Sequence, residues 1–571
     1  MIGQVTGGAA SRARADQIDA ILGETTRRYP EGAVQGLPRA WAECDLVVSH
    51  LALGATTRII APLLESKSTD PGVVVIDEAG QFVVPLVGGH GGGANDLARA
   101  IAAGLGATAV VTTATDAAGL PGLDTLGWAC SGDVAGVTRA ILDGEPVALA
   151  RSQPWPIPAL PSNVVVAGPG DASPPNCVGI VLVTDRTTAG STLPTVVLNP
   201  PSLVAGLGCN RGTTAASLRE LLHRTLADAR LAPGSLAAIT TVDAKADEPG
   251  LVELAAGLGV PLVTYPAGVL AGFDVPNPSD HAQAAVGTPS VAEASVLARG
   301  ATLVVPKQRT PEATCAIGRL PARGKLTVIG LGPGSRDLTT PRAQQAIRAA
   351  SIVVGYRPYV AQVKDLLRPG TRIASTPMGK EEERTAAAIQ FAREGNNVAL
   401  VCSGDPAIYA MASPTLEQGT DGIDVDIVPG VTASLAASAI LGAPLGHDHA
   451  TISLSDLHTD WETILRRLRA AAEADLVTVL YNPRSRTRLH HLPDALAIFS
   501  EHRPAKTPVA VVEEADRPEQ RITLSTIADF DVDVVNMNSL VVVGSSTTRY
   551  LTAGAGRTVM VTPRDYHWMN R

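Results

Sequence analysis

Short apolar runs rich in β-branched residues alternate with amphipathic stretches along most of the chain. Such runs are typical of buried strands, and the amphipathic stretches are typical of helices packed on a sheet. Strands that alternate with helices predict parallel sheets with helices on both faces. We therefore expect an α/β protein with several open parallel or mixed sheets and flanking helices. The runs are CDLVVSHL, GVVVID, ATAVVTTATD, TVVLNP, LAAITTVD, KLTVIGLGPG, ASIVVGY, NVALVCSGDP, LVTVLYNP and SLVVVGSS.

Two helix starts can be identified from capping residues. Thr213 or Thr214 can cap a helix whose leucines share one face, because a threonine hydroxyl accepts a hydrogen bond from a free N–H of the first turn. Thr340 before Pro341 predicts a second start, with proline at the first helical position. The leucines of the first helix are Leu218, Leu221, Leu222 and Leu226.

A chain of 571 residues exceeds what one hydrophobic core usually organises. Proline and serine are dense over residues 152–194, which indicates a connecting region. A second boundary is expected at residues 321–325, where one series of strands ends and a strand with its own glycine loop begins. The predicted domains are residues 1–125, 126–194, 195–320 and 325–571.

Composition narrows the possible partners. The net charge of −9 argues against nucleic acid or an anionic membrane as the main partner. No apolar run is long enough to cross a bilayer, and the N-terminus lacks the apolar core of a secretion signal, so we expect a cytoplasmic protein. The six cysteines are scattered singly, which favours reduced thiols over disulfides, and we expect no metal site.

The glycines from Gly330 to Gly334 follow a predicted strand and superficially match a dinucleotide-binding loop. Such a loop needs a helix that opens at the glycines and an acidic residue at the end of the next strand. Here the helix cannot begin before about Thr340, and the next strand ends in Gly355 and Tyr356. The sequence therefore argues against a dinucleotide site.

Three further loops also follow strands: Ser-Gly-Asp-Pro from Ser403, Pro-Gly-Val-Thr-Ala-Ser from Pro429, and Tyr-Asn-Pro from Tyr481. Open α/β sheets bind ligands at the carboxyl ends of their strands. With the GxGPG loop, this set resembles the class III tetrapyrrole methyltransferases, which use S-adenosylmethionine and fold as two α/β lobes. The resemblance implies cofactor contacts at Gly332, Pro333, Gly334, Ser403, Gly404, Asp405, Ile408, Thr432, Ala433, Tyr481 and Asn482.

Longer strings narrow the resemblance. MGKEEERTAAAI, SGDPAIYAMA, VPGVTASLAASAILGAPLGHDHATISLSDLHTDWE and LYNPRSRTR are similar to the precorrin-3B C17-methyltransferases, known as CobJ or CbiH. The resemblance covers about residues 325–571, and Ala407 and Ala410 depart from it where glycine is expected. It implies methylation of C17 of a tetrapyrrole, contraction of the macrocycle with formation of a lactone, and a homodimer formed through this domain.

Ring contraction needs proton transfer, so carboxylates and imidazoles near these loops are candidates. Asp448, His449, Asp456 and Glu462 are the residues we would test first; each could instead be a solvated or capping group. The substrate's carboxylates need cations, and Arg484, Arg486 and Arg488 follow the Tyr-Asn-Pro turn, with guanidinium groups that suit carboxylates bidentately; Arg484 and Arg486 are the expected substrate contacts. A solvated helix start is the alternative reading of these arginines.

Two glycine-rich segments of the N-terminal half, residues 88–96 and 206–212, follow strands and precede amphipathic helices. Free N–H groups at a helix start favour an anion such as a substrate carboxylate. With TTATD at Thr112 and VDAKADEPGL at Val242, they resemble the cobalt-precorrin-5A hydrolases, known as CbiG, over about residues 1–318. The short N-terminus is a departure, because it leaves the first strand poorly defined.

That resemblance implies opening of the lactone and release of acetaldehyde. Lactone opening requires an activated water and donors for the developing oxyanion. His90 could be the base, and Asp243, Lys245 and Glu248 form a second polar cluster; Asn95 and Arg211 are expected to contact substrate. His90 could instead only pack in its loop, and the sequence does not choose between the two clusters.

The two halves would thus act in succession on one intermediate of cobalamin biosynthesis. One alternative is a methyltransferase acting at another macrocycle carbon. Another is an N-terminal half that binds tetrapyrrole without catalysis. The sequence does not determine whether the substrate already carries cobalt.

Overall fold

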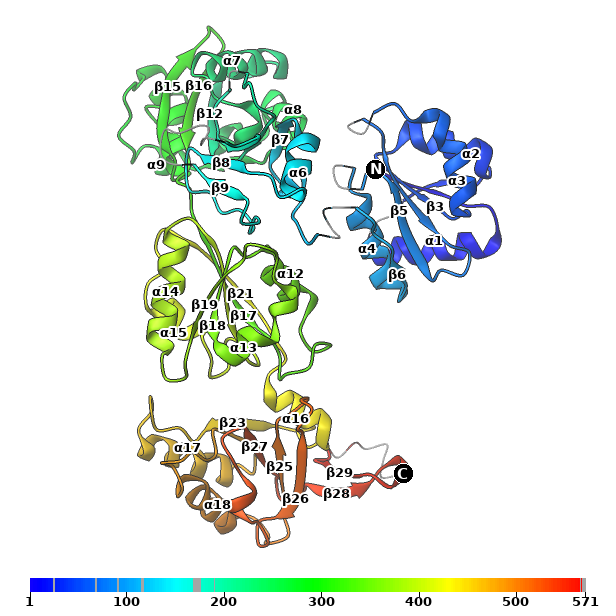
Figure 1. Cartoon of the computed structure of the whole chain (residues 1–571). Helices are drawn as coiled ribbons and strands as arrows, with labels where there is room; N and C mark the ends of the chain where they lie inside the picture. The colour runs from blue at the N-terminus through cyan, green and yellow to red at the C-terminus, as the bar shows by residue number, and fades with distance from the viewer. Residues whose placement is uncertain are drawn as a thin grey trace. The chain divides into compact units, whose positions relative to one another are not determined.

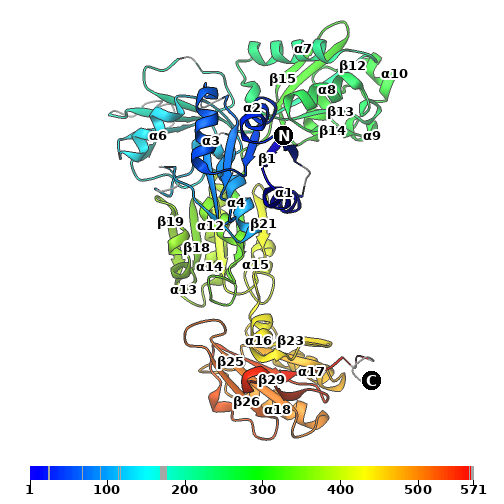
Figure 2. The same ribbon diagram turned by 90° about the vertical axis from the view of Figure 1, so that its right-hand side faces the viewer.

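The structure is a computed structural model that describes residues 1–23, 26–66, 69–89, 92–113, 115, 118–167, 176–188, 190–564 and 566, without the side chains of residues 281 and 285. Its contacts divide the chain into two compact units, mainly residues 1–322 and 323–571. Figure 1 and Figure 2 show the sheets of both units and the helices that cover them. The fold class expected from the sequence, α/β with several open parallel or mixed sheets, is confirmed.

The first sheet has the order β2-β1-β3-β4-β5-β6 and is parallel except between β4 and β5. Helices α1 and α4 bury their apolar side chains on one face, and α2 and α3 cover the other. The strands are β1 (Ile2–Val5), β2 (Arg27–Tyr29), β3 (Leu46–Ser49), β4 (Gly72–Ile76), β5 (Phe82–Val87) and β6 (Thr108–Ala109); the helices are α1 (Ala9–Leu22), α2 (Ala33–Glu43), α3 (Leu53–Ile60) and α4 (Ala94–Leu105).

The second sheet, in the order β7-β11-β10-β8-β9, lies in the part of the chain expected to be a connecting region. Only β7 is antiparallel to its neighbour. Asp185, directly after β10, receives two hydrogen bonds from the Arg319 guanidinium and one from Ser202, and so ties this sheet to the next. The elements are β7 (Ala129–Gly132), α6 (Val134–Leu142), β8 (Val147–Arg151), β9 (Val164–Val166), β10 (Gly179–Val183) and β11 (Thr195–Asn199).

The third sheet has the order β14-β13-β12-β16-β15, with β12, β13 and β14 parallel. Helices α7 and α8 cover one face, and α11 packs on the other. Thr214, one of the two threonines expected from the sequence to cap this helix, caps α7. The elements are β12 (Leu203–Cys209), α7 (Ala215–Asp228), β13 (Leu236–Val242), α8 (Pro249–Leu258), β14 (Leu262–Tyr265), α9 (Ala267–Leu270), α10 (Asp280–Val286), α11 (Ala292–Ala298), β15 (Thr302–Arg309) and β16 (Ala313–Arg319).

The first lobe of the second unit is a fully parallel sheet in the order β19-β18-β20-β17-β21. Helices α14 and α15 lie on one face, and α12 and α13 on the other (Figure 1). Thr340 caps α12, as predicted. The elements are β17 (Lys325–Gly330), α12 (Pro341–Ala349), β18 (Ile352–Tyr356), α13 (Arg357–Gln362), β19 (Arg372–Thr376), α14 (Glu381–Arg393), β20 (Asn397–Cys402), α15 (Ala412–Glu417) and β21 (Asp424–Val428).

The second lobe is a mixed sheet in the order β23-β24-β27-β25-β26, in which only β23 and β24 are parallel neighbours. Helices α17 and α18 cover one face; α16 and a small sheet of β22, β29 and β28 cover the other. The elements are α16 (Ala433–Leu441), β22 (Gly442–Ala443), β23 (His449–Ser453), α17 (Trp461–Glu473), β24 (Val477–Tyr481), α18 (His491–His502), β25 (Pro508–Glu513), β26 (Arg521–Thr526), β27 (Ser539–Val543), β28 (Arg549–Thr552) and β29 (Thr558–Val561).

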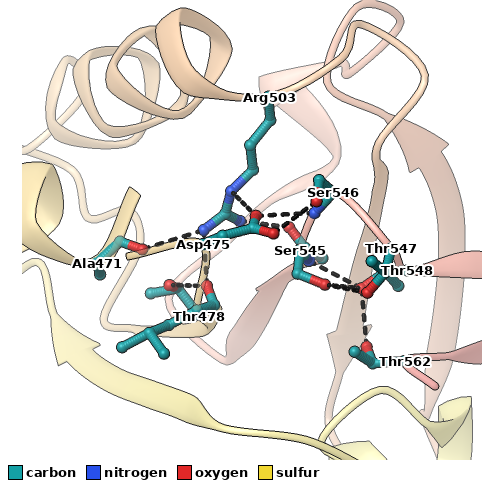
Figure 3. Close-up of polar contacts among 11 residues, drawn as sticks. Ala471, Asp475, Thr478, Arg503, Ser545, Ser546, Thr547, Thr548 and Thr562 are labelled. Carbon is teal, nitrogen blue, oxygen red and sulfur yellow. Dashed lines mark hydrogen bonds and ion pairs between the residues drawn. The ribbon is translucent and has the colours of Figure 1, made fainter. Parts of the chain in front are cut away.

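A buried arginine holds the elements of this second lobe together (Figure 3). The Arg503 guanidinium donates to the carbonyl oxygens of Ala471 at 3.3 Å, Leu476 at 2.6 Å and Gly544, and its Nε lies 3.5 Å from Asp475. Burial lowers the pKa of Arg503 to about 10, and Asp475 opposes that shift. One cation thus satisfies carbonyls at the ends of α17 and β27 and in the turn before β24.

Candidate functional site

Three glycines bring the loops of the first lobe into backbone contact at the carboxyl ends of β17, β20 and β21. A Cβ atom on Gly330 would lie 2.5 Å from the Gly404 carbonyl oxygen, and one on Gly430 would lie 2.2 Å from the same oxygen. Neither position has room for a methyl group. The sequence folds this way because these loops leave neighbouring parallel strands at one edge. We call residues 330–334, 403–409, 429–433 and 481–482 the loop cluster.

Gly332 and Gly404 form an antiparallel bridge, with N···O distances of 2.8 and 3.2 Å, and both have positive φ angles. The Ser403 hydroxyl lies 3.4 Å from the Gly332 carbonyl oxygen. Pro333 accepts a hydrogen bond from Arg517, whose side chain also packs on Gly334. The predicted cofactor residues of the first two loops therefore lie side by side.

The Asp405 carboxylate holds the loop cluster together from inside. One oxygen accepts from Ala407 N at 2.8 Å, and the other accepts from Gly430 N at 3.1 Å. The sequence suggested that Asp405 contacts the cofactor, and the structure shows that its carboxylate links two loops. Its effect on a ligand would then come through the position of the Gly430 loop.

Apolar and aromatic side chains of the cluster remain exposed. Ile408 is 41% exposed and Tyr409 is 55% exposed. The Tyr409 hydroxyl donates to the Thr451 carbonyl oxygen of the second lobe at 2.9 Å, and its ring lies 5.4 Å from that of Tyr481. Tyr409 was not among the predicted site residues, although it directly follows the SGDPAI string.

Tyr481 connects the second lobe to the start of α16. Its hydroxyl lies 2.6 Å from the Thr432 hydroxyl and accepts from Ser434 N at 2.9 Å. Asn482, which has a positive φ angle, donates to the Ser453 hydroxyl at 3.0 Å. The structure therefore brings Tyr481 into contact with Thr432 and Ser434, at the start of α16.

The four acid–base candidates of this half do not gather at one point. Asp448 and His449 are exposed at the beginning of β23, which is the opposite end of that strand from the loop cluster. Glu462 is exposed in the first turn of α17. Asp456 lies in the loop that follows β23, at the edge where Tyr481 and Asn482 lie, and its carboxylate is 3.7 Å from His491. His491 was not among the residues predicted from the sequence. The two adjacent histidines, His490 and His491, are the sequence feature that could have indicated it.

The two candidate arginines differ. Arg484 donates to the Val532 carbonyl oxygen at 2.6 Å and pairs with Asp533 at 2.9 Å, so its guanidinium is engaged within the protein. Arg486 is exposed on the same turn. Of the two, Arg486 is the better placed to meet a ligand carboxylate.

In the N-terminal half, Lys245 and Glu248 meet and Asp243 does not join them. Glu248 is 2% exposed; its carboxylate accepts from Gly212 N at 2.7 Å and from Lys245 Nζ at 3.0 Å. The Gly212 hydrogen bond, together with Lys245, holds the pKa of Glu248 below its usual value. Asp243 and Arg211 are exposed. The Lys245–Glu248 pair therefore holds the 209–212 loop in place through the Gly212 N–H.

The first glycine segment lies at another edge. Gly88 and Gly89 follow β5, which is antiparallel to β4, and Gly88 lies beside Gly72 at the start of β4. Asn95 is 3% exposed in the first turn of α4, and its N–H donates to the Gly89 carbonyl oxygen at 2.8 Å. His90 lies outside the described residues.

Within the described ranges, no group of three or more His, Cys, Asp or Glu side chains could hold a metal ion. None of the helices in the same ranges is long and apolar enough to cross a membrane.

Comparison with known proteins identifies the family. The family model "Tetrapyrrole (Corrin/Porphyrin) Methylases" matches residues 325–531. Over 245 residues, the chain is 47% identical to the "Probable cobalt-factor III C(17)-methyltransferase" of Salmonella typhimurium, covering 42% of this chain and 99% of the relative. The chain belongs to the tetrapyrrole methylases. This methylase is fused to domains of a second family, because the models "Cobalamin synthesis G N-terminal" and "Cobalamin synthesis G C-terminus" match residues 35–116 and 203–318.

Further relatives match the same methylase part. The "Precorrin-3B C(17)-methyltransferase" of Sinorhizobium sp is 39% identical over 249 residues, covering 43% of this chain and 97% of the relative. The "Crystal structure of the methyltransferase CobJ" is 37% identical, with a TM-score of 0.39, covering 42% of this chain and 100% of that chain. Both resemblances stated from the sequence, to precorrin-3B C17-methyltransferases and to CbiG, are confirmed.

Proposed function

We propose that residues 325–571 transfer a methyl group from S-adenosylmethionine to C17 of precorrin-3B or of its cobalt-containing counterpart, with contraction of the macrocycle. The observation that carries this proposal is the backbone contact of Gly330, Gly404 and Gly430 within a chain so closely related to two C17-methyltransferases. Glycines without room for a Cβ are what a loop needs if its backbone is to approach a ligand closely.

The residues of the loop cluster fit the cofactor. Gly332 and Gly404 bring two loop backbones together, Ile408 offers exposed apolar surface, and Thr432 and Tyr481 offer hydroxyls. S-adenosylmethionine would supply a methyl group on a sulfonium, which is a good leaving group. The protein's part is then mainly to orient the two reactants, which can account for a large share of the rate enhancement.

Arg486 is proposed to bind a substrate carboxylate, since it is exposed on the turn that follows Tyr481 and Asn482 in the chain. Arg484 would act only by shaping this turn through Val532 and Asp533. An Arg486→Gln variant should raise KM for the tetrapyrrole and leave S-adenosylmethionine binding unchanged.

The deciding experiment incubates the full chain with labelled S-adenosylmethionine and either precorrin-3B or cobalt-factor III. We expect one added methyl group by mass, its position at C17 by NMR, and a ring-contracted lactone as product. Methylation at another carbon would favour the alternative methyltransferase. Absence of label from both macrocycles, with S-adenosylmethionine bound, would overturn the proposal.

For the N-terminal half we propose opening of the lactone of cobalt-precorrin-5A with release of acetaldehyde. Support comes from the two cobalamin synthesis G matches. The alternative, a tetrapyrrole-binding module without catalysis, is favoured by one observation: the Glu248 carboxylate is engaged within the protein, because it accepts hydrogen bonds from Lys245 Nζ and from Gly212 N. His90→Ala and Asp243→Asn should each slow aldehyde release and leave methyl transfer intact. Absence of aldehyde release by the parent chain would favour the module, and parent rates in both variants would show that neither His90 nor Asp243 is catalytic.

We further propose a cytoplasmic homodimer, with neither nucleic acid nor a membrane as partner. The six cysteines are all free, which suits a reducing compartment. The dimer is suggested by the methylase resemblance alone, and light scattering of the full chain tests it.

A further inference from the structure

Three aromatic rings gather on the face of the second lobe that α17 and α18 cover. His491, the first residue of α18, is 2% exposed, and its ring stacks on Trp461 with 4.0 Å between centroids and 19° between planes. The ring of His490 meets that of His491 edge-on at 4.4 Å. This packing leaves His491 one orientation, so its two ring nitrogens have fixed neighbours.

The neighbours of His491 determine where its proton lies. Nδ1 is 3.0 Å from the Leu454 carbonyl oxygen, which can only accept, so Nδ1 carries the hydrogen. Nε2 then presents a lone pair toward the Asp456 carboxylate, 3.7 Å away. A lone pair and a carboxylate that face one another attract a proton, and one proton between them makes an imidazolium–carboxylate pair. The two groups together therefore form a proton acceptor.

This couple lies at the edge of the second-lobe sheet where Tyr481 and Asn482 of the loop cluster also lie. Strands β23 and β24 are parallel, so their carboxyl ends meet at one edge. Leu454 N donates to the Tyr481 carbonyl oxygen at 2.9 Å, and Asn482 donates to the Ser453 hydroxyl at 3.0 Å. The Asp456 side chain is 45% exposed at this edge, whereas His491 is enclosed behind it.

We propose that Asp456 and His491 are the proton-accepting couple of the methyltransferase site. Asp456 takes the proton from the macrocycle as a catalytic residue, and His491 acts through Asp456 as a positioning residue that shares the proton. This inference rests on the proposed methyltransferase function.

Methyl transfer leaves a positive charge on the macrocycle, so a proton acceptor is needed to remove it. When the methyl group leaves the sulfonium, the sulfur keeps the electron pair of the broken bond and becomes neutral, and the macrocycle gains one positive charge. One bond from hydrogen to the macrocycle then breaks, its electron pair stays on the macrocycle, and the proton passes to the Asp456–His491 couple. The exposed Asp456 carboxylate later releases this proton to water. No oxidant or reductant is required.

The surroundings of His491 favour the neutral form of its imidazole. Burial is the main influence that lowers the pKa of His491; Asp456 raises it, and His490 and Arg488 lower it. Asp456 lies in the loop after β23, His490 directly precedes α18, and Arg488 lies in the loop before His490.

The test uses the full chain and two variants that keep local shape. His491→Asn retains a donor for the Leu454 carbonyl oxygen and lacks Nε2, and Asp456→Asn removes the exposed charge. His502→Asn is the matched control, because His502 is exposed in the last turn of the same helix. Methyl transfer is measured from pH 5 to 9, together with S-adenosylmethionine affinity by calorimetry.

The parent rate should fall on the acid side, because a protonated couple cannot accept a second proton. Both variants should lose this acid limb and about 10²–10³-fold in kcat, with S-adenosylmethionine affinity unchanged, and Asp456→Glu should restore part of the rate. If Asp456→Asn keeps the parent rate and pH profile, the couple is overturned even if His491→Asn fails to fold. A parent enzyme that methylates neither macrocycle would instead overturn the proposed function itself.

Discussion

Two glycine loops, one in each half of the chain, are held by a carboxylate, and the two carboxylates have different surroundings. Glu248 is buried beside Lys245 and accepts from Gly212 N. Asp405 is partly exposed, and its two oxygens accept from the backbone N–H groups of Ala407 and Gly430. The same bond to a glycine N–H is thus made by a buried ion pair in one half and by a carboxylate open to water in the other.

This difference indicates how much each loop contributes to the stability of the folded protein. Removal of one partner from a buried ion pair leaves an uncompensated charge inside the protein, which is expensive. A carboxylate that water can reach has no such penalty, so its loss is felt mainly in the position of the loop. The N-terminal loop should therefore be a stability element, and the methyltransferase loop should be a ligand-positioning element.

The largest effect is expected from Glu248→Ala, which leaves Lys245 buried without its partner and the Gly212 N–H unpaired. Residues 203–318 should lose roughly 3–5 kcal/mol of unfolding free energy. Hydrogen exchange across a urea series, read from peptides of that range, measures the change. Asp247→Ala, at an exposed neighbour, should stay within about 0.5 kcal/mol. Equal effects of the two variants would show that the ion pair does not hold the loop.

Low pH alone, without a mutation, should cause part of this loss of unfolding free energy. The folded-state pKa of Glu248 is lowered, so its contribution to stability is complete above the ordinary value of 4.5 and is lost as the pH falls through the folded value. The urea midpoint of residues 203–318 should therefore decline below about pH 4.5, and Glu248→Gln should flatten the decline. An unchanged slope in the variant would assign the acid sensitivity to other groups.

Asp405→Asn should have a smaller effect on folding and a clear one on binding. The amide keeps one acceptor, so one of the two N–H bonds to Ala407 and Gly430 is lost, at roughly 1.5–3 kcal/mol for a charged acceptor. If loss of this hydrogen bond displaces the Gly430 loop, S-adenosylmethionine affinity should fall by about 10–100-fold, which calorimetry can measure. Asp421→Asn, exposed in the same lobe, is the control. Unchanged affinity would remove Asp405 from the positioning role.

The smallest effect is expected from Tyr481→Phe. The ring and its packing remain, and only the hydroxyl contacts with Thr432 and Ser434 are lost, which together are worth about 1 kcal/mol. S-adenosylmethionine affinity should drop less than about tenfold. A loss as large as that of Asp405→Asn would mean that Tyr481 contacts the ligand directly.

The sequence predicted the features that depend on local pattern. Strands with flanking helices, the caps at Thr214 and Thr340, and the glycine loops at strand ends all follow from residue type and spacing over a few positions. These signals are sufficient to place the loops after β17, β20 and β21 at one edge of the first-lobe sheet.

The sequence did not predict features that depend on residues far apart in the chain. Gly212 and Glu248 are 36 positions apart, and Leu454 and His491 are 37 apart, so only the packed fold brings them together. Arg484 shows the converse: its type suits a ligand carboxylate, and the fold instead gives it Val532 and Asp533 as neighbours. Which residues a side chain contacts depends on the parts of the chain that the fold brings together, and residue spacing alone does not specify this.

The meeting of Gly330, Gly404 and Gly430 also limits how this chain can vary over generations. A clash in a protein core is often relieved when a neighbouring side chain becomes smaller. Here a Cβ on Gly330 or on Gly430 would lie 2.5 or 2.2 Å from the Gly404 carbonyl oxygen, a backbone atom that no change of side chain removes. A side chain at position 330 or 430 therefore has no compensating substitution at position 404, where glycine is itself favoured by its positive φ angle.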